Sequence, residues 1–146
     1  MSDTTAEAIV AEAVDWIGTP YRHQGWAKGV GCDCLGLVRG VWLAVYGTAL
    51  EDPGPYAADW AEQGRGDPLL EAAQAHCRAV ERTTPRRGDL ILFRWRPHLP
   101  AKHCAIALGP DRFVHAYQRH AVMQSSLVPQ WSRRIAGLFV FPDRVS

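Results

Sequence analysis

One cysteine of this chain stands where a thiol could act as a nucleophile. Cys34 follows a glycine-rich loop, residues 29–31, and Asp33, which is a favoured residue for capping the start of a helix. From Cys34 onward apolar residues recur at helical spacing, so we expect a buried helix over residues 34–46 that stops at Gly47. The unpaired amides and the dipole at a helix start favour an anion, and the thiolate is the reactive form of cysteine. Cys34 is therefore a candidate nucleophile, although cysteine is also a common buried residue.

Two histidines further along the chain could supply a base and a group that orients it. His103 begins one expected strand, residues 103–108, and His115 lies in the next, residues 112–117. A two-residue turn at Pro110 would place the two imidazoles on opposite faces of the sheet. A loop of three or five residues would place them on the same face as diagonal neighbours. The sequence leaves this choice open.

Together the three residues could form a nucleophile, a base and an orienting group. This requires that the helix starting at Cys34 packs against the face that holds both histidines. His103 would then take the thiol proton and later give it to the leaving amine, while His115 would hold the tautomer of His103. The backbone amide of Cys34 is a natural donor to an oxyanion, and the Tyr21 hydroxyl is a second candidate. We expect residues 21–26, which are aromatic and polar, to form one wall of the cleft.

The order of the remaining elements predicts an α+β fold in a single domain, residues 1–146. Helical patterns come first and strand patterns follow, which favours N-terminal helices packed on a central antiparallel β-sheet. The expected helices are residues 5–17, 34–46 and 68–82, and the expected strands are residues 89–95, 103–108, 112–117 and 137–141, with a further strand within residues 119–130. Residues 48–66 contain several prolines and glycines and indicate an irregular surface segment.

Composition narrows the classes of partner. With 16 basic and 15 acidic side chains and a net charge of +1, the chain does not have the charge of a general nucleic-acid or membrane-surface binder. Residues 1–7 are acidic and polar, so we expect synthesis in the cytoplasm without a signal peptide, and no apolar run reaches transmembrane length.

The four cysteines lack the spacing of a disulfide framework, and we expect them to be reduced: Cys32, Cys34, Cys77 and Cys104.

The segments that could do chemistry resemble motifs of the NlpC/P60 family of cysteine peptidases. Residues 33–38 read Asp-Cys-Leu-Gly-Leu-Val, which resembles the family signature Asp-Cys-Ser-Gly-Leu-Val. Three more matches follow the family's order over nearly the whole chain: Gly18-Thr19-Pro20-Tyr21-Arg22, Arg87-Gly88-Asp89-Leu90, and the paired histidine segments 103–109 and 113–116. The resemblance implies a papain-like NlpC/P60 fold with Cys34, His103 and His115 as catalytic residues. It also implies endopeptidase action on peptidoglycan stem peptides, commonly between D-glutamate and diaminopimelate or lysine, with no metal or organic cofactor.

The chain is similar in particular to the phage-tail and gene-transfer-agent branch of that family. The segments that carry this likeness are residues 31–42, 93–96 and 133–137. The resemblance implies a place in the tail of a virion or similar particle, with tail-tip or baseplate hub proteins as partners. Such partners would bring the enzyme to the wall or periplasm of the target cell and raise its local concentration there.

Substrate contacts are expected from the residues that flank the nucleophile. The candidates are Tyr21, His23, Asp33 and Leu35. Leu35 replaces the usual serine of the family signature, which removes a hydroxyl near the substrate.

Other readings of the same residues stay open. Cys32 could oxidise with Cys34 or help to bind a metal, and a zinc-binding structural module could use Cys32, Cys34, Cys104 and a histidine. A catalytically silent part of a tail assembly could keep the fold. An amidase or acyltransferase could use the same three residues as a peptidase.

Overall fold

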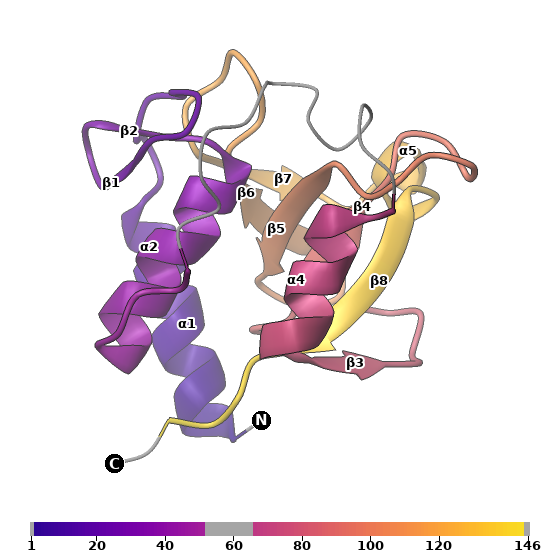
Figure 1. The fold of residues 1–146 in the computed structure, drawn as a ribbon, viewed down its shortest axis with the longest axis horizontal. Coiled ribbons are helices and arrows are strands. Elements are labelled where there is room, and N and C mark those ends of the chain that lie inside the picture. The colour runs from indigo at the N-terminus through magenta and orange to yellow at the C-terminus, as the bar shows by residue number, and fades with distance from the viewer. Residues whose placement is uncertain (1, 52–65, 145–146) are drawn as a thin grey trace.

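The fold is a six-stranded sheet with three helices on one face (Figure 1). The computed structural model describes residues 2–51 and 66–144, so most of the predicted irregular segment, residues 48–66, lies outside the described residues. The sheet has the order β3-β8-β4-β5-β6-β7, and all neighbouring strands are antiparallel. The described helices are α1 (Asp3–Asp15), α2 (Cys34–Tyr46), α4 (Pro68–His76) and the short α5 (Pro129–Ser132). The strands are β3 (Arg78–Val80), β4 (Leu90–Phe93), β5 (His103–Ala107), β6 (Arg112–His115), β7 (Met123–Ser126) and β8 (Ile135–Val140), beside a separate hairpin of β1 (Trp26–Ala27) and β2 (Gly31–Cys32).

This arrangement confirms the predicted α+β class, with helices packed on an antiparallel sheet. The first two expected helices and the four expected strands are present, with boundaries that differ by two residues or fewer. The further strand expected within residues 119–130 is β7. No helix among residues 2–51 and 66–144 is long and apolar enough to cross a membrane.

Helix α2 begins and ends at the residues that the sequence indicates. The side chain of Asp33 accepts a hydrogen bond from the Gly36 amide at 2.8 Å, and Gly47 closes the helix in the left-handed region with a φ of 76°. Gly40 lets α2 approach α1 closely, because a Cβ there would lie 2.1 Å from a ring carbon of the buried Trp16. Local capping and one close helix contact therefore fix the position of Cys34.

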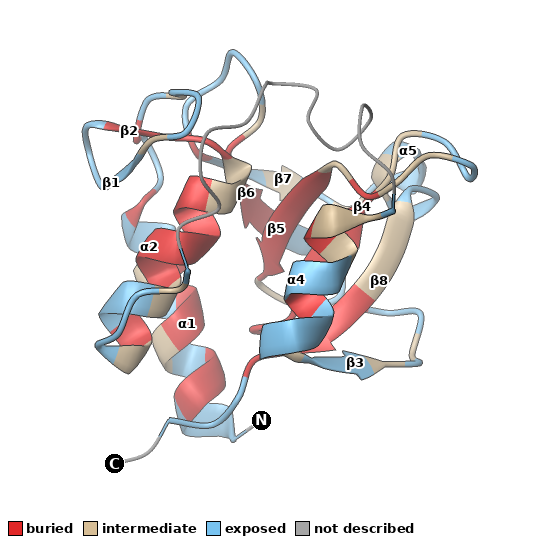
Figure 2. Ribbon diagram, viewed as in Figure 1, coloured by how far each residue is buried: buried red, intermediate tan, exposed pale blue. Residues whose placement is uncertain are grey.

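Strand β5 is buried along its whole length (Figure 2), but different groups cover the two faces of the sheet. Cys104 and Ile106 of β5 face the main core, where α1, α2 and α4 pack. The alternate residues Ala105 and Ala107 face a smaller cluster that is covered by Trp131 and other side chains. The expectation that α2 packs against the face of the histidines is wrong. Side chains alternate along β5, so the helix lies on the Cys104 face while His103 belongs to the other.

The hairpin between β5 and β6 has an odd loop. Ala107 pairs with Phe113, and the Leu108 amide donates to the Arg112 carbonyl at 2.9 Å, which leaves the three residues Gly109-Pro110-Asp111 in the loop. His103 and His115 therefore lie on the same face of the sheet. This confirms the condition that the sequence left open.

The third expected helix is shorter than predicted. Helix α4 ends at His76 rather than near Arg82, and Cys77 already has an extended backbone. Residues 78–80 pair with β8 and form an edge strand of the sheet. Pairing with a distant strand outweighs the local helical periodicity here, because backbone hydrogen bonds of a sheet depend on partners that the local sequence does not contain.

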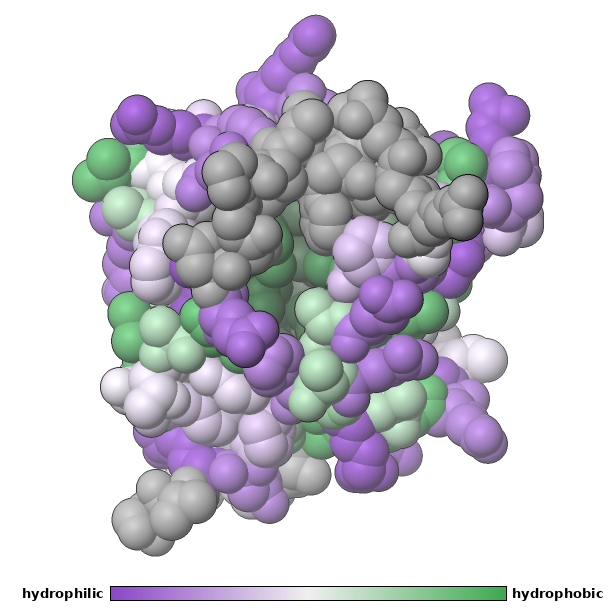
Figure 3. Space-filling view, viewed as in Figure 1, coloured by the Kyte–Doolittle hydropathy of each residue, from purple (hydrophilic) through white to green (hydrophobic). Residues whose placement is uncertain are grey.

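Hydrophobic side chains line a small hollow between α2 and α4 (Figure 3). The cavity has a volume of about 50 Å³, and Leu35, Trp42 and Leu69 are among its lining residues. The main core therefore reaches from the sheet up to the first turn of α2.

Candidate active site

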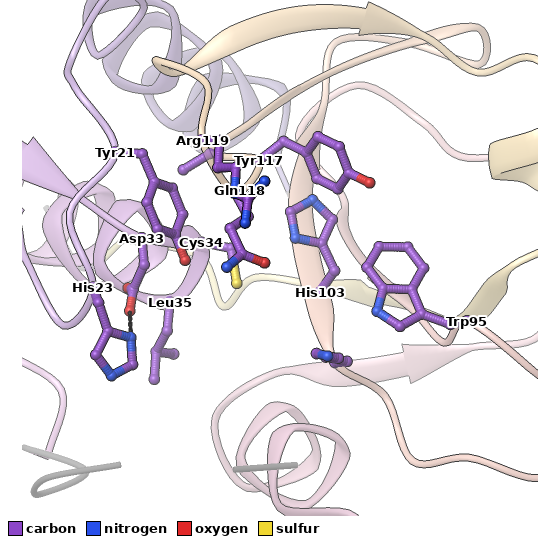
Figure 4. Close-up of a pocket in the computed structure, with 12 residues that line it drawn as sticks. Tyr21, His23, Asp33, Cys34, Leu35, Trp95, His103, Tyr117, Gln118 and Arg119 are labelled. Carbon is purple, nitrogen blue, oxygen red and sulfur yellow. Dashed lines mark ion pairs between the residues drawn. The ribbon is translucent and has the colours of Figure 1, made fainter. Parts of the chain in front are cut away.

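A cleft of about 320 Å³ lies where the start of α2 faces the start of β5 and the segment that follows β6 (Figure 4). Its volume is at the lower end of the range of small-ligand sites. Its walls contain Tyr21, His23, Asp33, Cys34, Leu35, Trp95, Lys102, His103, Ala116, Tyr117, Gln118 and Arg119. Every residue that the sequence proposed for catalysis or substrate contact lines this cleft except His115, which lies buried behind His103.

The wall before the nucleophile is held by backbone contacts. The Cys32 amide donates to the Pro20 carbonyl, and the Arg22 amide donates to the Cys32 carbonyl, both at 3.0 Å. A Cβ on Gly36 would lie 1.7 Å from the Gly25 carbonyl oxygen, so only glycine allows the loop to pack on the start of α2. These contacts place Tyr21 beside Cys34, as the expected cleft wall requires.

Asp33 is a buried cap whose carboxylate joins the loop to the helix. One oxygen accepts from the Gly36 amide and the other from the Gln24 amide, each at 2.8 Å, and only 4% of Asp33 is exposed. The ring of His23 lies farther away, with its Nδ1 3.9 Å from the carboxylate (Figure 4). Asp33 therefore has a clear structural role.

The thiol of Cys34 ionises more easily than an ordinary cysteine. The Cys104 thiol and the His103 imidazole both lie within hydrogen-bonding reach of a Cys34 thiolate, and they lower its pKa well below the usual value although burial opposes this. The Cys104 thiol also donates to the Cys34 carbonyl at 3.3 Å. The neighbouring Cys34 and burial raise the pKa of Cys104, so Cys34 is the member of the pair that ionises.

Cys32 has the opposite character. It is fully buried, and burial together with Asp33 and Cys34 raises the pKa of its thiol to about 12. All four cysteines are free thiols. Cys32 is therefore a packed thiol of low reactivity in this structure.

The His103 side chain reaches Cys34 although α2 packs on one face of the sheet and His103 belongs to the other face. Cys34 is the first residue of α2 and His103 the first residue of β5, so both side chains lie at the ends of their elements. Both line the cleft, with the thiol and the imidazole on its opposite sides (Figure 4). The site therefore forms at the end of the sheet where β5 begins.

A row of hydrogen bonds continues from His103 across two neighbouring strands. Nε2 of His103 lies 2.8 Å from Nδ1 of His115, and Nε2 of His115 lies 2.8 Å from Oγ of Ser125. His115 is only 1% exposed, and burial, with smaller contributions from His103 and His120, lowers its pKa to about 3. His115 is therefore a neutral imidazole at ordinary pH.

Aromatic rings pack around the two imidazoles and help to bury them. The Trp131 ring centroid lies 5.7 Å from that of His103 and 5.3 Å from that of His115. Trp95 stacks beside His103 at 5.9 Å. Sequence reasoning missed Ser125, Trp131 and Trp95, because their positions depend on which strands pair rather than on a local motif.

Tyr21 presents a protonated hydroxyl at the cleft. Burial, followed by the charges of Cys34 and Asp33, raises its pKa to about 12. The hydroxyl can therefore donate to a developing oxyanion, as the sequence suggested.

The ligands of the alternative zinc module are not brought together in the described part of the chain. Among residues 2–51 and 66–144, no group of three or more His, Cys, Asp or Glu side chains is placed to hold a metal ion. The alternative of a structural zinc module thus has no ligand set in the described part of the chain.

Comparison with known proteins assigns the chain to a family. Residues 18–139 match the model of the NlpC/P60 family. The chain is 32% identical over 127 residues to the murein DD-endopeptidase MepS/murein LD-carboxypeptidase of Escherichia coli K12, covering 86% of this chain and 57% of that protein. It is 26% identical over 139 residues to the gamma-DL-glutamyl hydrolase of Bacillus subtilis 168, covering 92% of this chain and 29% of that protein.

Solved structures agree with this assignment. The NlpC/P60 domain of the peptidoglycan hydrolase SagA superposes with a TM-score of 0.62 and 30% identity, covering 93% of this chain and 98% of that domain. The chain spans little more than half the length of the E. coli relative. With the fold and the cleft in agreement, the chain belongs to the NlpC/P60 family.

Proposed function

We propose that this chain is a cysteine endopeptidase that hydrolyses peptidoglycan stem peptides. One observation above all supports the proposal: the thiol of Cys34, with its lowered pKa, shares a cleft with His103, whose other ring nitrogen is 2.8 Å from the buried His115. This is the arrangement of nucleophile, base and orienting group that acyl transfer requires. The relatives named above include a murein endopeptidase and a peptidoglycan hydrolase.

The proposed reaction has two acyl-transfer steps. The Cys34 thiolate attacks the carbonyl carbon of the scissile amide, and the resulting oxyanion accepts hydrogen bonds from the Cys34 amide and the Tyr21 hydroxyl. Protonated His103 gives its proton to the leaving amine as the C–N bond breaks, which leaves a thioester on Cys34. His103 then takes a proton from water, and the hydroxide attacks the thioester and releases a carboxylate and the Cys34 thiolate.

We propose that the bond cut is of the D-glutamyl-diaminopimelate type. The cleft has charges of both signs, because Asp33, Lys102 and Arg119 are among its lining residues. A stem peptide offers free carboxylates and amines on either side of that bond, which such walls could bind. The name of the B. subtilis relative, a gamma-DL-glutamyl hydrolase, agrees with a glutamyl bond, whereas that of the E. coli relative is a DD-endopeptidase.

Digestion of purified peptidoglycan, with mass analysis of the released fragments, tests activity and bond together. Wild-type protein should release fragments that end at D-glutamate, and a folded Cys34→Ser variant should release none, because His103 is not set up to deprotonate a hydroxyl. Fragments cut only at a D-alanyl bond would refute the bond assignment. Full activity of the Cys34→Ser variant would refute the cysteine-peptidase proposal.

We also propose that the protein acts at the tail tip or baseplate of a phage or gene-transfer particle. The proposal rests on the similarity of residues 31–42, 93–96 and 133–137 to the phage-tail branch of the family. Mass spectrometry of purified particles from the source strain tests it. The protein should co-purify with tail proteins at a fixed ratio, and its absence from intact tails would contradict the proposal.

A further inference from the structure

Ser125 ends a row of hydrogen-bonding side chains that begins at the proposed base. The row uses one residue from each of three neighbouring strands, which are His103 of β5, His115 of β6 and Ser125 of β7. Ser125 pairs with Phe113 across β6 and β7, and side chains alternate along both strands, so its hydroxyl lies on the same face as His115. The register of the sheet therefore brings these groups together without any local sequence motif.

The base role of His103 fixes where the protons of this row must lie. The ring nitrogen of His103 that faces Cys34 must be free to accept the thiol proton, so neutral His103 carries its proton on Nε2. That N–H donates to Nδ1 of His115, so neutral His115 must carry its own proton on Nε2. The only described hydrogen-bond partner of that N–H is the Ser125 hydroxyl oxygen at 2.8 Å.

We propose that Ser125 is a positioning residue that holds His115 in the tautomer needed for His103 to act as a base. This inference rests on the proposed cysteine-peptidase function. Without an acceptor at Ser125, the N–H of His115 would be buried and unpaired, which is unfavourable. His115 would then favour the other tautomer, with its proton on Nδ1, and His103 would in turn carry its proton on the nitrogen that faces Cys34. The base would point an N–H at the thiol instead of a lone pair.

The surroundings of His115 support this role. Its imidazole is 1% exposed and packs against Trp131 and Phe113, at centroid distances of 5.3 and 4.6 Å, so water has little access to the ring. Burial also keeps His115 neutral, with a pKa of about 3, so its tautomer rather than its charge is the variable that a neighbour can set.

Two substitutions that are nearly isosteric with each other isolate the hydroxyl. Ser125→Thr keeps the acceptor, whereas Ser125→Val places a methyl group there, which cannot accept a hydrogen bond. Both side chains suit a strand. Ser126→Ala is the matched control, because it removes the neighbouring hydroxyl of the same strand, which points to the opposite face.

The measurements are kcat and KM for wall hydrolysis, the pH profile of Cys34 alkylation by iodoacetamide, and the ¹⁵N chemical shifts of the His115 ring. Ser125→Val should lower kcat about tenfold or more with little change in KM, and it should move the midpoint of alkylation to higher pH. Its ¹⁵N shifts should report a proton on Nδ1, whereas wild type and Ser125→Thr should have it on Nε2. Ser126→Ala should match wild type in all three measurements.

A folded Ser125→Val variant with the kcat, alkylation profile and tautomer of wild type would overturn the inference. Equal losses in the Thr and Val variants would also overturn it, since that pattern indicates damage to packing. The alkylation and NMR measurements do not need wall hydrolysis. If wild type proved inactive on every wall substrate, the proposed function would fail while the tautomer result still decided the role of Ser125.

Discussion

At the scale of single residues, the side chains from Cys34 to Ser125 form a row in which each contacts the next. Contacts with Cys104 and His103 favour the Cys34 thiolate, and His103 is oriented by His115, which burial keeps neutral. Residue types and order in the sequence predicted the first three members of this row. Ser125 could not be predicted, because its place opposite His115 depends on the pairing of β6 with β7.

Substitution of His115 should separate orientation from chemistry. We expect His115→Gln to retain partial wall hydrolysis, because an amide can still accept from Nε2 of His103, and we expect His115→Ala to lose about tenfold more. Rates measured on one wall substrate, with thermal melts to show that both variants are native, make the comparison. Equal losses would remove the orienting role of His115 but leave Cys34 and His103 as nucleophile and base.

Removal of the Cys104 thiol should make Cys34 harder to ionise. Cys104→Ala deletes the first cause of the lowered Cys34 pKa, so the midpoint of Cys34 alkylation should move to higher pH. The control is Cys77→Ala, which removes a partly buried thiol that does not contribute to the lowered pKa of Cys34. An alkylation profile of Cys104→Ala identical to that of wild type would show that the Cys104 contact does not matter.

His115 should make the protein less stable in acid. Its pKa falls from an ordinary 6.5 to about 3 on folding, so the unfolded chain binds more protons between these values. The stabilising contribution is fully present above pH 6.5 and is lost as pH falls toward 3. Thermal melts should show a steeper fall in Tm over this range for wild type than for His115→Gln. Parallel curves for the two proteins would show that protonation of His115 is not what destabilises the fold in acid.

At the scale of elements, caps and alternation predicted most of the fold, while contacts between distant segments decided the rest. Asp33 and Gly47 marked both ends of α2, and the loop at Pro110 proved to be the odd loop that places both histidines on one face. The sequence could not show which face of the sheet α2 covers, because both faces of β5 are apolar. The sequence pattern also predicted that the third helix continues through residues 78–80. These residues form β3 instead, because they pair with β8.

The packing of α1 on α2 should be sensitive to one added methyl group. In a Gly40→Ala variant the new Cβ would lie 2.1 and 2.3 Å from two ring carbons of Trp16, so the helices must move apart at a cost of about 1–3 kcal/mol. We expect Tm to fall by several degrees in a thermal melt. Gly109→Ala is the control, because a Cβ there has no atom within 4 Å and should leave Tm nearly unchanged. A Gly40→Ala variant as stable as Gly109→Ala would contradict this packing.

At the scale of the whole molecule, the cleft lies where the ends of several elements meet, which is a common way to build a site on a rigid scaffold. The start of α2 supplies Cys34, the start of β5 supplies His103, and the segment after β6 supplies Tyr117 and Arg119. With a net charge of +1, the chain has little overall field to attract a substrate, so recognition must come from the cleft itself or from partners.

Metal removal should leave the protein unchanged. The described residues hold no group of ligands for a metal ion, so dialysis against a chelator should alter neither Tm nor wall hydrolysis. Stoichiometric zinc that resists dialysis, together with a lower Tm after its removal, would favour the structural zinc alternative instead.

The central claim is that Cys34 is the nucleophile, and alkylation resolved by residue tests it most directly. The protein is treated with iodoacetamide near neutral pH, and the labelling of all four cysteines is followed by peptide mass analysis alongside residual wall hydrolysis. Cys34 lines the cleft and has a lowered pKa, whereas burial raises the pKa of Cys32 and Cys77 to about 12, so Cys34 should react first. Activity should fall in step with Cys34 labelling. Faster labelling of another cysteine, or full activity with Cys34 completely alkylated, would contradict the claim.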